Sequence, residues 1–129
     1  MIKNTFFIKT FKDGRQYPIF SVSPKQYEML YELGMYHLSK SKGVGTVLES
    51  LNKIESGELS QYELSAGDWC VIDMKKSIST ITNNFDEFEP IQIDTLEIIQ
   101  LMKEWFDFLT AYENGKIPGI IYPNRRNLG

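Results

Sequence analysis

Two short apolar stretches near the start of this chain flank a polar segment. The stretches NTFFIKTF and QYPIFSV are rich in aromatic and β-branched residues, and KDGR between them contains an Asp-Gly pair typical of a tight turn. This pattern predicts a β-hairpin. Because Pro18 cannot donate a hydrogen bond to a neighbouring strand, we expect its strand to lie at a sheet edge.

Three further stretches have apolar residues at helical spacing. They predict a helix over 24–41, a second over 45–56, and a long third helix that begins at the DTLE motif of residues 94–97. That motif has the form of a helix start with a capping acid and a glutamate in the first turn. The third stripe is the widest, and it ends at Asn114-Gly115.

The centre of the chain predicts a second hairpin. WCVIDMKK (69–76) and SISTITNN (77–84) are rich in β-forming residues, whereas ELSQYELSAGD before them is interpreted as a polar connection. The order of elements predicts an α+β fold, in which an antiparallel sheet built from two hairpins carries helices mainly on one face. The length favours a single domain over 1–129, with 115–129 as an extended tail able to dock.

Composition narrows the class and the compartment. Hydrophobic residues make up 42% of the chain, which fits a globular domain, and no stretch approaches the ~20 apolar residues needed to cross a bilayer. The start lacks the continuous apolar segment of a signal peptide. The single cysteine, Cys70, lies in an apolar run, where a buried reduced thiol is expected. We therefore expect a cytoplasmic protein that does not contact membranes.

The net charge of −3 is distributed unevenly. Residues 1–54 contain 8 Lys/Arg and 4 Asp/Glu, residues 55–107 contain 3 and 12, and residues 108–129 contain 3 and 1. The middle block is therefore strongly acidic, and its field favours encounters with a basic partner. Direct nucleic-acid binding is disfavoured, because the basic pairs at 75–76 and 125–126 are small and phosphates would meet this acidic block.

Catalytic and metal chemistry find little support in the sequence. The only histidine, His37, lies in the first predicted helix, and no G-x-S-x-G elbow accompanies Cys70. One cysteine and one histidine cannot complete a zinc site, and the acids of 86–94 lack the spacing of a calcium loop. We therefore expect no enzyme, metal or cofactor. A hydrolase using Asp68 and Asp73 stays open as a minor alternative.

The segments GDWCVIDM, NNFDEFEPIQI and EWFDFL, in this order, resemble small immunity proteins of bacterial polymorphic-toxin and contact-dependent inhibition systems. The resemblance covers roughly residues 45–113. It implies a non-enzymatic protein that binds and occludes a cognate toxin, with a basic nuclease as the leading expectation. Carried over residue by residue, it implies toxin-binding roles for Asp68, Trp69, Asp73, Asp86, Glu87, Glu89 and Glu97.

Two other contact surfaces remain open. The N-terminal hairpin and helix, outside the matched region, could form the contact instead. Alternatively, the stripe around Trp105 and Phe108 could pair with a helix of another protein or of a second copy, which would make the chain a regulatory or scaffold subunit. We expect a monomer or a weak homodimer.

Overall fold

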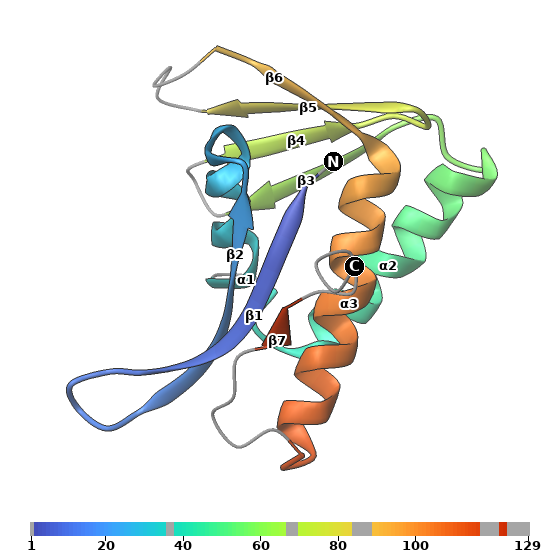
Figure 1. The fold of residues 1–129 in the computed structure, drawn as a ribbon. Helices are drawn as coiled ribbons and strands as arrows, with labels where there is room; N and C mark the ends of the chain where they lie inside the picture. Colours follow the sequence, from blue (N-terminus) through green and yellow to red (C-terminus); the bar gives the residue numbers. More distant parts are fainter. Residues whose placement is uncertain (1, 36–37, 67–69, 84–88, 117–121, 124–129) are drawn as a thin grey trace.

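The computed structural model describes residues 2–35, 38–66, 70–83, 89–116 and 122–123, and it confirms the α+β class. Two antiparallel sheets pack with the helices around a shared core (Figure 1). The two predicted hairpins are both present, but they belong to separate sheets rather than to one. Within the described residues, no helix is both long enough and apolar enough to cross a membrane.

The first sheet is built on the N-terminal hairpin. Strands β1 (Lys3–Thr10) and β2 (Gln16–Ser23) pair along their whole length, and Gly14 closes the turn with a φ of 86°. The sheet order β2-β1-β7 places Pro18 on an edge strand, as predicted. On the other side of β1, β7 (Tyr122–Pro123) pairs with Thr5 and Phe6, so this part of the tail is docked as an extended piece.

The second sheet has the order β3-β4-β5-β6. Its strands are β3 (Tyr62–Ala66), β4 (Cys70–Met74), β5 (Ile78–Asn83) and β6 (Ile91–Asp94). The β4–β5 hairpin was predicted, but the polar connection was wrong over Tyr62–Ala66, which is a strand. That stretch alternates outward polar side chains with buried Leu64, and alternation rather than mean hydropathy is the strand signal.

The long helix was predicted correctly, and the first was not. Helix α3 covers Thr95–Glu113, and α2 covers Ser41–Ser56 and ends at left-handed Gly57. In place of one helix over 24–41, the chain forms the 3-10 helix η1 (Lys25–Tyr31) and the short α1 (Glu32–Met35). One tertiary contact favours this interruption: the buried indole N–H of Trp105 donates to the carbonyl oxygen of Leu38 at 2.7 Å.

Trp105 is the centre of the core. Its ring lies 4.9 Å from that of Phe20, 5.6 Å from that of Phe6 and 5.8 Å from that of Phe108. Trp105 is fully buried and Phe108 nearly so. The stripe around Trp105 and Phe108 is therefore inside the protein. The prediction that it forms a helix-pairing surface of a scaffold subunit is wrong.

Candidate functional site

Four of the seven residues implied by the resemblance, Asp68, Trp69, Asp86 and Glu87, lie outside the described residues. The other three occupy different elements. Asp73 is in the middle of β4, Glu89 is exposed just before β6, and Glu97 is in the first turn of α3. Of these three residues, Asp73 is the one with polar neighbours on both adjacent strands.

Asp73 belongs to the outer face of the four-stranded sheet. Side chains along these strands alternate between buried and more exposed positions, and the buried ones join the core. Figure 1 shows α2, α3 and the first hairpin gathered on the core side of this sheet. We define the outer face by the alternate, outward positions: Glu63, Ser65, Val71, Asp73, Ile78, Thr80, Thr82, Gln92 and Asp94.

One row of this face crosses all four strands. The strand register places Glu63 opposite Asp73, Asp73 opposite Thr80, and Thr80 opposite Gln92. The two carboxylates are therefore neighbours, and the amide nitrogen of Gln61 donates to Oδ1 of Asp73 at 2.5 Å. The row offers carboxylate, hydroxyl and amide groups to whatever approaches the sheet.

Asp94 adds a carboxylate at the far edge strand, where it borders a depression that Lys76 also lines. It occupies the capping position of α3, but its side chain makes no capping hydrogen bond, which corrects the expected role as a capping acid. Thr95 anchors the helix start instead: its N–H donates to the carbonyl of Ser77, and its hydroxyl to that of Lys75. The exposed Asp94 carboxylate lies opposite Ile78 on the sheet.

None of the described outward positions of the four-stranded sheet is a lysine or arginine. The nearest cations in sequence, Lys75 and Lys76, lie in the turn between β4 and β5. The Nζ atom of Lys76 is 3.7 Å from where a Cβ on Gly57 would stand, so this side chain reaches the C-terminus of α2. In the described part of the chain, no ion pair involves Glu63, Asp73 or Asp94.

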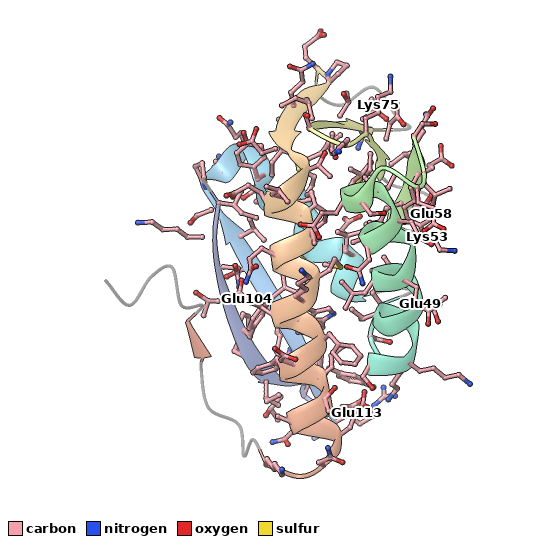
Figure 2. All side chains as sticks on the ribbon, turned by 90° about the vertical axis from the view of Figure 1, so that its right-hand side faces the viewer. Glu49, Lys53, Glu58, Lys75, Glu104 and Glu113 are labelled. Carbon is pink, nitrogen blue, oxygen red and sulfur yellow. The ribbon has the colours of Figure 1, made fainter. Side chains whose placement is uncertain are left out.

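The helical side of the molecule has a different charge pattern (Figure 2). Here Glu49 and Lys53 share the surface of α2, with Glu58 just beyond its end. On the adjacent helices, Lys103 Nζ lies 4.0 Å from Glu55 Oε1. Figure 2 also labels Glu104 and Glu113 on this side, so it too is rich in acids, but lysines lie among them. The described outward positions of the sheet hold carboxylates and no lysine or arginine, which makes the outer face the better candidate for binding a basic partner.

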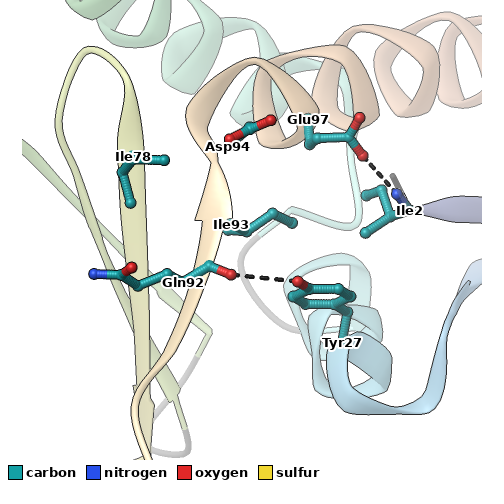
Figure 3. Close-up of a pocket in the computed structure, with 7 residues that line it drawn as sticks. All are labelled: Ile2, Tyr27, Ile78, Gln92, Ile93, Asp94 and Glu97. Atoms are coloured by element: carbon teal, nitrogen blue, oxygen red, sulfur yellow. Dashed lines mark hydrogen bonds between the residues drawn. The ribbon is translucent and has the colours of Figure 1, made fainter.

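Glu97 has a structural contact that the sequence did not indicate. Its Oε2 atom accepts the backbone N–H of buried Ile2 at 2.6 Å, which ties the start of β1 to the start of α3 (Figure 3). Nearby, the hydroxyl of Tyr27 donates to the carbonyl of Gln92 at 3.3 Å. Both contacts border a depression of about 170 Å³. The two hydrogen bonds at its border link β1 to α3 and η1 to β6.

Cys70 is buried, as predicted. Burial raises the pKa of its thiol to about 11 from 9.0, with a smaller contribution from the carboxylate of Glu32. The thiol is therefore protonated and inaccessible near neutral pH. The other candidate for nucleophilic chemistry, His37, lies outside the described residues, and among the described residues no three metal-binding side chains gather.

Two carboxylates of the outer face, Glu63 and Asp94, were not among the residues that the sequence indicated. Glu63 was assigned to a polar connection, and Asp94 to a helix cap. The signal for Glu63 was present in the alternation of YELSA, where Glu63 and Ser65 share one face. For Asp94, no sequence signal distinguishes a capping carboxylate from an exposed one.

Comparisons with known proteins do not extend this description, since no protein-family model, no curated protein and no solved structure matches the chain.

Proposed function

We propose that this chain is a non-enzymatic immunity protein, which inhibits a cognate protein toxin by covering a basic surface of that toxin with the outer face of its four-stranded sheet. The observation that carries the proposal is the pairing of Glu63 with Asp73 on the outer face, where none of the described outward positions is a lysine or arginine. The resemblance described above supports the same class of protein.

Physical chemistry supports a cationic partner for this face. Two carboxylates directly opposite each other across a strand pair repel, and a basic side chain between them relieves that repulsion. The flanking groups of Thr80, Thr82 and Gln92 supply further hydrogen-bond donors and acceptors. Arg and Lys in the active-site groove of a nuclease would fit such a surface, and complementary charge would speed association.

The experiment mixes the purified protein with the toxin domain encoded beside its gene and measures the dissociation constant by calorimetry at several salt concentrations. Reversing charge in Glu63→Lys/Asp73→Lys should weaken binding by about 10-fold or more and reduce its salt dependence. The matched control Glu49→Lys/Glu58→Lys makes the same change in net charge on the helical side. It should leave affinity within a few-fold of the parent.

A further variant with three substitutions, Asp86→Lys/Glu87→Lys/Glu89→Lys, tests the acidic segment before β6 separately. If the outer-face variant and this variant are both folded and bind the toxin as tightly as the parent does, the proposal of an acidic contact surface is wrong. Protection of cells that express the toxin should follow the same order as affinity. Protection lost equally in the control variant would show that net charge, and not the outer face, is responsible.

A further inference from the structure

A second surface lies away from the outer face, along the first hairpin and η1. It is a groove of about 970 Å³. We call it the hairpin groove and define it by its apolar lining: Phe7, Phe11, Ile19, Met29, Tyr31 and Ile91. Apolar side chains in a groove of this size would be covered in a complex, because contiguous exposed apolar surface marks interaction sites.

The exposure of large apolar side chains is concentrated here. Phe11 and Tyr31 in the groove are each 38% exposed, and Tyr17 beside them is 40% exposed. These are three of the five large hydrophobic residues found exposed among those described. The opposite side of the same hairpin buries Phe6 and Phe20 in the core. The outward rings of Phe11 and Tyr17 instead contact each other across the hairpin, with centres 5.2 Å apart.

The groove has a basic surround. Lys9 and Lys25 line it and are exposed; two acids, the exposed Glu28 and the buried Glu32, line its η1 side and its floor, so the excess of positive charge comes from the hairpin. The hairpin itself carries Lys3, Lys9, Lys12 and Arg15 against a single acid, Asp13, which pairs with Arg15. Lys9 Nζ lies 5.3 Å from the centre of the Phe11 ring. Positive charge and exposed aromatic surface therefore coincide.

We propose that the hairpin groove binds an acidic peptide segment of a protein partner. An aromatic or aliphatic side chain of that segment would enter the groove between Phe11 and Tyr31, and its Asp or Glu residues would lie against Lys9 and Lys25. This site is separate from the outer face, and the hairpin that forms one side of it is basic. The apolar lining favours a peptide over a single-stranded nucleic acid, which needs several phosphate contacts in addition to stacking.

The test begins with a library of random 12-residue peptides displayed on phage and selected on the immobilised full-length protein. Selected sequences should combine Asp or Glu with Phe, Trp, Leu or Ile. A synthetic labelled copy of the most enriched peptide is then titrated in fluorescence anisotropy. Lys9→Glu/Lys25→Glu should weaken its binding by about 10-fold or more, and Phe11→Ser should weaken it as well.

The matched control is Lys42→Glu/Lys53→Glu, which makes the same charge change on two exposed positions of α2. It should bind the peptide like the parent. Failure to enrich any peptide class, or equal loss of binding in control and groove variants, would overturn the proposal. A 15-nucleotide oligo(dT) is the competing ligand. If it binds more tightly than the peptide and competes with it, the groove binds a single-stranded nucleic acid and the peptide proposal is wrong.

Discussion

Glu63 and Asp73 lie directly opposite each other on adjacent antiparallel strands, with their carboxylates on the outer face of the four-stranded sheet. Like charges at such a position destabilise a strand pair, and Gln61 relieves only part of this by donating to Asp73. Neither side chain forms an ion pair with a described residue. A like-charged pair on the solvent side of the sheet, with Glu63 exposed and Asp73 half-buried, supports a binding role.

The first prediction follows from this repulsion. Glu63→Gln removes one of the two charges and keeps a side chain of similar shape, so it should stabilise the free protein by about 0.2–1 kcal/mol. Urea unfolding at low salt measures this free energy. Glu58→Gln, which removes an exposed acid with no carboxylate across a strand, is the control and should change stability less. A destabilised Glu63→Gln would show that the carboxylate has a structural partner.

The same pair shows what the sequence could and could not predict. Runs of β-forming residues with turn signals identified the hairpins, and the apolar stripe identified α3, because these signals are local. The pairing of Glu63 with Asp73 depends on β3, which was hidden in a stretch rich in serine and glutamate. The contact of Glu97 with Ile2 joins residues 95 positions apart, and no local pattern encodes such a distance. Of the two paired carboxylates, the sequence therefore indicated Asp73 but not Glu63.

Gly34 makes the second prediction. A Cβ added there would stand 2.7 Å from Cε1 of Phe20 and 3.1 Å from Cζ2 of Trp105, both in buried rings. Gly34→Ala should therefore destabilise the protein by about 1–3 kcal/mol, measured by thermal unfolding. The control is Gly45→Ala in α2, whose Cβ would meet only the partly exposed Phe106 ring at 3.3 Å. There the gain in helix propensity offsets the closer contact. Equal losses in both variants would contradict the packing argument.

The third prediction concerns the thiol of Cys70. Its folded pKa of about 11 lies above the ordinary 9.0, so between these values the unfolded chain loses the proton while the folded chain keeps it. Stability linked to this group is present below pH 9 and is lost as the pH rises towards 11. The free energy of unfolding of the parent should therefore fall more steeply between pH 9 and pH 11 than that of Cys70→Ala, which has no thiol to titrate. Parallel profiles would exclude Cys70 as the cause.

A related measurement tests the burial of the same thiol at constant pH. At pH 8, a thiol reagent should label Cys70 slowly in the folded protein and quickly in urea, because the reagent requires an accessible thiolate. Fast labelling without urea would contradict the burial.

The fourth prediction separates the two roles that Glu97 could have. Its carboxylate accepts the N–H of buried Ile2, so Glu97→Ala should leave that donor without this acceptor and destabilise the protein by about 1–3 kcal/mol. Glu97→Gln keeps an acceptor oxygen and should lose much less. Asp107→Ala, which removes an exposed acid from the same helix, is the control for net charge. If Glu97 only anchors β1, Glu97→Gln should bind the toxin as tightly as the parent does. A Glu97→Gln protein that is stable but binds at least 10-fold more weakly would instead place this carboxylate in the toxin contact.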